Sequence, residues 1–203
     1  EIDTRLESKL GFDRVRTFVA DRCSTEYAVT RVTEETFSND AKVIASRLAL
    51  TDEMRLIVMF EENFPTNGYI DCLDFLKPLE NTGYNIDLLS LGKLRTMVET
   101  VRKLTNFFMS IKDGVYPNLK RMSAQIMSFP EVQRRIDIIL DKFGDVKDTA
   151  SDKLLEIRRA IKSKEGTISK RANAILRQAQ ADGLVDEDAG LSVRDGKLLI
   201  PVN

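Results

Sequence analysis

The strongest constraint on this chain is a seven-residue apolar repeat near its C-terminal end. Leu154, Ile161, Ile168 and Ile175 are spaced seven residues apart, and Ile157 fills the intermediate position of the first heptad. This spacing places apolar side chains along one seam of an α-helix and is typical of a helix that packs lengthwise against another helix. We therefore predict a long, arm-like helix with these five residues as its apolar seam.

The predicted arm has recognisable start and stop signals. Ser151 is a suitable N-cap residue, and Gly183 follows the last residues of the repeat. A helix of roughly 32 residues would extend about 48 Å at 1.5 Å per residue. Beyond it, Asp195-Gly196 separates two short segments rich in apolar residues, which predicts a β-hairpin with a two-residue turn.

The chain before the arm shows helical spacing almost throughout. One long helix is expected to run to Phe60 from an N-cap at Ser38, Asn39 or Asp40, and another from about Ile86 to Lys112, with shorter helices after Pro117 and Pro130. The predicted fold class is therefore mainly α: a multi-helix core, a long arm helix and a short terminal β-hairpin. The expected domain bounds are 1–148 for the core, 149–183 for the arm and 184–203 for the hairpin.

The opening residues predict a pair of shorter helices. Leu10, Val15, Phe18 and Val19 would line one face of the first helix, and Ser24 would cap the second.

Composition argues against an active site in this chain. It has no histidine, which is the commonest general base and metal ligand. It also contains no phosphate-binding loop, dinucleotide-binding turn or nucleophile elbow. Cys23 and Cys72 lie in apolar surroundings far apart in sequence, which predicts buried, reduced thiols. We expect no catalytic residue and no metal site. No apolar run approaches the ~20 residues that cross a bilayer, so we expect a cytoplasmic protein without membrane contact.

The arm carries a local excess of positive charge. Between Lys153 and Arg177 there are eight basic and two acidic residues, although the whole chain has a net charge of −1. Lys164 and Arg171 occupy seam positions where a simple two-stranded coil would have apolar residues. Two interpretations stay open, a solvated helix face and a surface for the nucleic-acid backbone. The candidate nucleic-acid-binding residues are Arg158, Lys162, Lys164, Lys170, Arg171, Arg177, Arg194 and Lys197.

Three segments of the chain resemble a known family. They are FGDVKDTASDKLLEIRRAIKS (143–163), ISKRANAILRQAQADG (168–183) and SVRDGKLLIPV (192–202), and the opening KLGFDRVRTFVADRCS (9–24) is similar as well. Together they resemble the N-terminal region of bacterial MutS-like proteins of the second type, the branch of the mismatch-repair MutS superfamily with a C-terminal Smr nuclease domain.

The resemblance implies a role for each part of the chain. The parent protein would be a homodimeric ATPase that encloses DNA and acts on branched or mismatched DNA and in recombination control. The arm would be its lever helix, and it would lead into a clamp of reduced size. ATP and Mg²⁺ would bind in an ATPase domain after Asn203, followed by the endonuclease domain, so the chain is expected to be a fragment. The resemblance places no catalytic residue in this chain. The lever would position the clamp and relay the ATP state.

Two alternatives remain from the sequence. The seam is also typical of a coiled-coil element for protein–protein contact or dimerisation. Some members of the branch act on stalled ribosomes, where a basic arm would meet RNA or ribosomal protein. Gly166 within the arm and Gly144 at its base are candidate hinges. We also expect the isolated arm to be partly disordered or paired in a non-native way, because its apolar seam would be exposed.

Overall fold

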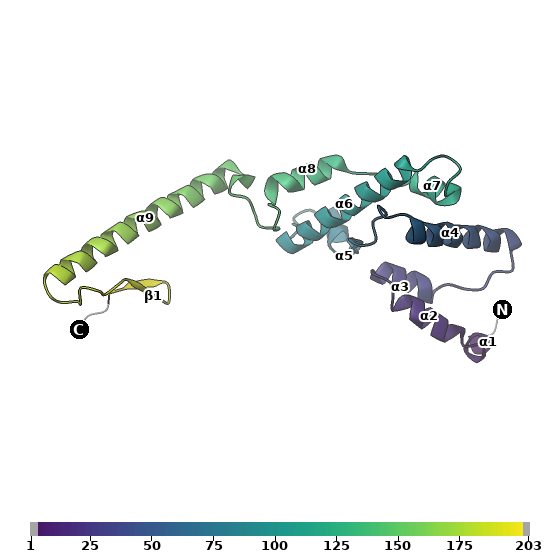
Figure 1. The fold of residues 1–203 in the computed structure, drawn as a ribbon, viewed down its shortest axis with the longest axis horizontal. Helices are drawn as coiled ribbons and strands as arrows, with labels where there is room; N and C mark the ends of the chain where they lie inside the picture. Colours follow the sequence, from purple (N-terminus) through teal and green to yellow (C-terminus); the bar gives the residue numbers. More distant parts are fainter. Residues whose placement is uncertain (1–3, 201–203) are drawn as a thin grey trace. The chain divides into compact units, whose positions relative to one another are not determined.

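The computed structural model describes residues 4–200 of the 203-residue chain (Figure 1). It confirms a mainly helical fold with one long helix and a short antiparallel hairpin. The chain divides into two compact units, Glu1–Val146 and Lys147–Asn203. From the sequence we expect an apolar strand from Leu198 to Val202, and its residues 201 and 202 lie outside the described range.

The first unit opens with α1 (Thr4–Lys9), α2 (Phe12–Ala20) and α3 (Glu26–Thr33). The prediction of one continuous apolar face from Leu10 to Val19 was wrong at its start. Gly11 adopts a left-handed conformation with φ 73°, so Leu10 lies in a turn before α2. Left-handed backbone suits glycine because it has no Cβ, and the break here separates two helices.

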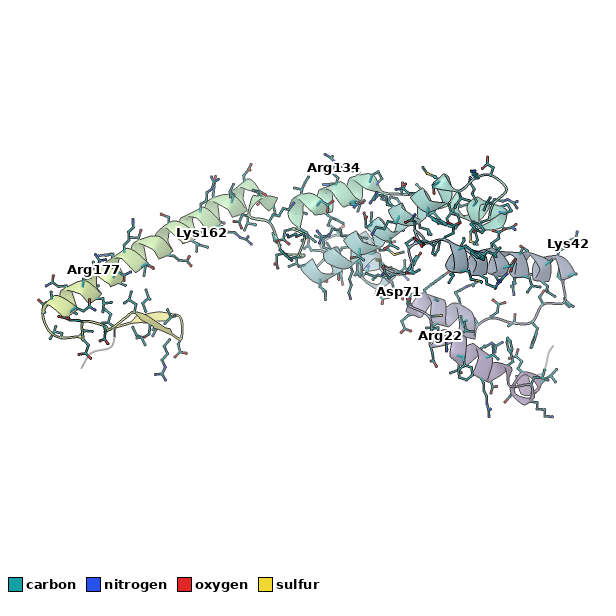
Figure 2. The ribbon with its side chains drawn as sticks, in the orientation of Figure 1. Arg22, Lys42, Asp71, Arg134, Lys162 and Arg177 are labelled. Carbon is teal, nitrogen blue, oxygen red and sulfur yellow. The ribbon has the colours of Figure 1, made fainter. Side chains whose placement is uncertain are left out.

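The cap of α3 also differs from the prediction. Thr25, and not Ser24, caps the helix, and its hydroxyl accepts a hydrogen bond from the Ala28 N–H at 3.1 Å. A second acceptor comes from far along the chain, because the Asp71 carboxylate accepts the Tyr27 N–H at 3.3 Å. Figure 2 labels Asp71 beside the helical pair. Two of the orphan N–H groups of α3 are thereby satisfied.

Two long helices follow as predicted. In α4 (Ala41–Phe60), the Asp40 carboxylate accepts the Lys42 and Val43 N–H groups at 2.8 and 3.3 Å. In α6 (Leu88–Ser110), the Asp87 carboxylate accepts the Ser90 N–H at 2.9 Å. Between them lie α5 (Leu73–Leu76) and the 3₁₀-helix η1 (Lys77–Glu80). Both long helices therefore begin at an aspartate N-cap.

An aromatic cluster forms the centre of the first unit. Ile57 from α4 is fully buried and packs with Phe107 and Phe108 from α6. Phe64 meets the Phe107 ring edge-on at 5.2 Å between centroids, and Phe107 and Phe108 lie at 5.1 Å. The C-terminal half of α4 is thus fixed against α6, whereas side chains from Ala41 to Leu48 are exposed.

Two short helices complete this unit, α7 (Pro117–Ser123) and α8 (Pro130–Ile139). Each has its proline in the first turn, as predicted, where the missing N–H costs nothing. Gln133 of α8 donates its amide to the Glu99 carboxylate of α6 at 2.7 Å. The α8 helix is followed by an isolated antiparallel bridge between Leu140 and Val146.

The two thiols are free, but they are not buried as expected. Cys23 and Cys72 are both only half-buried. Burial, and secondarily the carboxylate of Asp71, raises the pKa of the Cys72 thiol above its ordinary value.

The second unit consists of the 3₁₀-helix η2 (Asp148–Ala150), α9 (Asp152–Ala181), β1 (Ser192–Arg194) and β2 (Lys197–Leu199). At 30 residues, α9 extends about 45 Å and runs through Gly166 without interruption. In the hairpin turn, Asp195 and Gly196 have φ of 51° and 72°, as a type I′ turn requires. Within the described residues, no helix is long and apolar enough to span a membrane.

Candidate nucleic-acid interface

The base of α9 is held by a cap and an ion pair. The Ser151 hydroxyl accepts the Leu154 N–H at 3.2 Å, as the sequence predicted. The Arg158 guanidinium binds the Asp148 carboxylate of the preceding turn. This hydrogen bond, together with the positive charges of Arg158 and Lys162, holds the pKa of Asp148 below its ordinary value. The positive charges of Arg158 and Lys162 therefore already act on a carboxylate of the same unit, that of Asp148.

The predicted seam is largely uncovered. Leu154 is half-buried, but the exposed fraction rises from 45 % at Ile157 to 50 % at Ile161, 55 % at Ile168 and 60 % at Ile175. Among the described residues of α9, Leu176 alone is buried. The seam is thus an apolar stripe that faces solvent in this chain, which is the arrangement expected of a helix whose lengthwise partner lies elsewhere.

Six of the eight cations of α9 form two rows at different distances from the seam. Successive residues of an α-helix are rotated by about 100°, because a turn contains 3.6 residues. Arg159, Lys170 and Arg177 each follow a seam isoleucine by two positions, which places this outer row on the opposite side of the helix. The second row flanks the seam and consists of Lys153, Lys164 and Arg171.

Most of these cations have no acidic partner among the residues that the structure describes. Lys153 binds Glu156 at 3.5 Å. Within the part of the chain that the structure describes, Arg159, Lys164, Lys170, Arg171 and Arg177 have no hydrogen-bond or ion-pair partner for their side chains, and all five are exposed. Figure 2 labels Lys162 and Arg177 along α9. The helix therefore presents uncompensated positive charge to solvent on two sides.

The hairpin adds two further candidates. Arg194 and Lys197 face each other directly in the antiparallel register and are exposed. Like charges at directly opposed positions destabilise a sheet. An anion bound between Arg194 and Lys197 would remove this repulsion. Both residues are therefore suitable for binding a phosphate.

Within residues 4–200, no group of three or more metal-ligating side chains comes together. The exposed cations of α9 and the hairpin can together hold a polyanion by charge.

The comparisons with known proteins point to one kind of relative. No family model matches the chain. A protein of Listeria innocua named Endonuclease MutS2 is 26 % identical over 203 residues, covering 99 % of this chain. Proteins of the same name from Geobacillus thermodenitrificans and Geobacillus sp. strain WCH70 are 26 % and 24 % identical over 95 % and 98 % of the chain. The chain is MutS2-like.

The MutS2-like chain spans only about a quarter of the length of these relatives, 25 to 26 %. The likeness extends over nearly all of its residues, from the core helices to the hairpin. The word endonuclease in the relatives' name describes those proteins.

Two features of α9 were not predicted from the sequence. Arg159 belongs to the outer row with Lys170 and Arg177, and its signal was its place two residues after Ile157. Asp148 was not recognised as the partner of Arg158, because the two are ten residues apart and meet only through the turn before α9. The structure brings Lys170 and Arg177 onto one face, and it places Lys164 and Arg171 on another.

Proposed function

We propose that this chain is the non-catalytic core and lever segment of a homodimeric, MutS-like DNA-binding ATPase, and that α9 and the hairpin contact the DNA backbone. The observation that carries this proposal is the set of exposed cations along α9 that have no partner among the described residues. Their positive charge is concentrated on one helix of a chain whose net charge is −1. Such contacts bind phosphates irrespective of base sequence.

The proposal assigns the remaining chemistry of the whole protein to other domains. ATP and Mg²⁺ would bind outside this segment, because the sequence has no phosphate-binding loop and the described residues contain no group of three or more metal-ligating side chains. The helix of about 45 Å would position a clamp and transmit the ATP state to it. Endonuclease activity, if the whole protein has it, would lie outside these 203 residues, and we expect neither ATP hydrolysis nor DNA nicking by this chain.

The test is binding of the 203-residue chain to duplex, branched and single-stranded DNA across a salt titration. If six cations neutralised phosphates, the slope of log affinity against log salt would be about −5. A variant with Lys162, Lys164, Lys170 and Arg171 changed to Gln should bind more weakly and show a flatter slope. A control variant changes Lys9, Arg31, Lys42 and Lys112, which are exposed cations of the first unit, to Gln.

The outcomes separate clearly. Preserved binding in the control and loss in the α9 variant support contact through the arm. Equal losses in both variants would show binding by net charge alone, and absence of binding at low salt would refute the proposal. Stronger binding to ribosomal RNA than to any DNA would favour the ribosome as the partner.

A second function is favoured by the exposed seam, namely pairing with another helix in a protein–protein coiled coil. The isoleucines at 157, 161, 168 and 175 are between 45 % and 60 % exposed, and they extend along about five turns of the helix. Sedimentation of the chain with and without an Ile168→Glu substitution tests this. The coiled-coil function would be supported by a dimer that dissociates in the variant and whose stability is the same with and without DNA.

A further inference from the structure

The distal half of α9 contains a hollow on the side opposite its apolar seam. Its lining residues fall at helical spacings of three and four, and its open volume is about 670 Å³. Ala174 forms the floor between Lys170 on one side and Arg177 on the other, one turn away in each direction. The hollow is lined by Lys170, Asn173, Ala174, Arg177 and Gln178.

Two amides in the hollow are already oriented by the helix. The Asn173 side-chain amide donates to the Ser169 carbonyl at 2.9 Å, and the Gln178 amide donates to the Asp182 carboxylate at 3.0 Å. Each donation uses one N–H of an NH₂ group that has two. The second N–H of each amide is available to an incoming acceptor, beside cations that have no partner among the described residues.

The spacing of the two cations suits two phosphates on opposite edges of a groove. Lys170 and Arg177 are seven residues apart, which is about 10.5 Å along the helix axis. The major groove of duplex DNA is about 12 Å wide. The small side chain of Ala174 leaves room for the nucleic-acid backbone to approach the helix closely between them.

We propose that this outer face, with Lys170 and Arg177 as its two anchors and Arg159 in line with them, is the surface of α9 that contacts the phosphate backbone of duplex DNA. This inference rests on the proposed function, that the chain binds DNA at all. The seam then stays available for packing against protein. Lys164 and Arg171 flank that seam and do not contact the phosphates.

The chain offers a closely matched pair of variants for the test. Lys170→Gln with Arg177→Gln removes one Lys and one Arg seven residues apart from the outer face. Lys164→Gln with Arg171→Gln removes the same two residue types at the same spacing from beside the seam. All four residues are exposed, and none has a partner within the described chain. The two variants therefore differ only in the face that loses its charge.

The expected result is a difference between faces at equal net charge. The outer-face variant should bind duplex DNA about tenfold more weakly at moderate salt, with a salt slope smaller by about 2. The seam-side variant should bind within about twofold of the original chain. Helical content of both variants is compared by circular dichroism, so that a loss of binding is not a loss of helix.

A second pair of substitutions keeps the test independent of the cations themselves. Ala174→Glu places a carboxylate on the floor of the hollow, and Ala160→Glu places one on the seam-side row, four residues before Lys164. Both are exposed helix positions. Ala174→Glu should weaken binding more than Ala160→Glu.

Three outcomes would overturn the inference, in distinguishable ways. Equal loss in the two double variants would mean that the charge of α9 acts without a preferred face, and the proposed function would stand. A larger loss in the seam-side variant would place the phosphates beside the seam. If the unsubstituted chain fails to bind duplex DNA at low salt, the proposed function itself fails.

Discussion

The Glu53 carboxylate accepts the backbone N–H of Leu119 at 2.7 Å across 66 residues of sequence. It also accepts the backbone and side-chain N–H groups of Asn118, at 3.0 and 2.7 Å. Glu53 lies on α4 and is 8 % exposed, so one buried carboxylate supplies the acceptors at the start of α7. The position of α7 on α4 therefore depends on a charged residue in the interior.

Replacing Glu53 with Ala should destabilise the first unit by about 3 kcal/mol, since three donors lose a charged acceptor at a buried site. Urea denaturation followed by circular dichroism measures this loss. Glu53→Gln retains an acceptor without the charge and should cost less than Glu53→Ala. The neighbouring Asp52→Ala is the control, because the Asp52 and Arg55 side chains are more than half exposed and their pair contributes less than about 1 kcal/mol.

Gly68 has a specific reason to be glycine. Its φ is +84°, and a Cβ at this position would lie 2.3 Å from the Thr100 hydroxyl, which donates to the Gly68 carbonyl at 3.0 Å. Gly68→Ala should therefore destabilise the chain by about 2 kcal/mol. Gly92→Ala is the matched control within α6: a Cβ there has open space, and the substitution should stabilise by about 0.5–1 kcal/mol. Similar effects of the two substitutions in thermal denaturation would contradict this assignment.

The ion pair at the base of α9 should make its stability depend on pH. The lowered pKa of Asp148 means that the pair stabilises the folded state fully above the ordinary aspartate value of about 3.9 and loses that effect as pH falls through the lower folded value. Asp148→Asn should reduce the thermal stability of α9 at pH 7 and have little effect near pH 2. Melting curves at both pH values, at low salt, measure the difference. An equal effect of the substitution at both values would show that charge is not involved.

Amide exchange should distinguish the arm from the core. Side chains along α9 are exposed except near its ends, whereas α6 buries Val98, Phe107 and Phe108. Backbone amides between Ser151 and Ala181 should therefore exchange much faster than those in the second half of α6. Protection of the whole of α9 equal to that of α6 would indicate that the seam is covered in solution.

Gly166 provides a separate test of the hinge hypothesis. The helix passes through Gly166 uninterrupted, and a Cβ there would meet nothing within 4 Å. Gly166→Ala should raise the helicity and exchange protection of α9, with a gain of about 1 kcal/mol. Unchanged DNA binding in this variant would argue against a hinge, and a loss of binding with increased helicity would support one.

Several elements could be predicted because their signals are local. The N-caps Asp40 and Ser151 accept hydrogen bonds from N–H groups two or three residues ahead, and Asp195-Gly196 reverses the chain within two residues. The heptad spacing of the isoleucines likewise fixes which residues share a face of α9. In each case the interacting groups are neighbours along the chain, so the order of residues is enough to predict the cap, the turn or the helix face.

Other features were predicted wrongly or not at all, because they depend on the backbone conformation of a single residue or on distant partners. The left-handed Gly11 divides the first predicted helix, and Cys23 and Cys72 are less buried than their apolar neighbours suggested. No local pattern indicates that Glu53 caps α7. These outcomes follow from which segments pack together, and sequence spacing does not specify that.

The sequence by itself determined the long helices, the Ser151 cap, the hairpin turn and the periodic placement of apolar and basic residues on α9, since all of these rest on interactions within a few residues. The tertiary structure decided which of those surfaces are covered. It buries Ile57 among the rings of α6, leaves the seam isoleucines in solvent and engages Arg158 with Asp148 while Lys170 and Arg177 stay unpartnered among the described residues. Burial and charge pairing depend on contacts between segments, and only the folded chain brings those segments together.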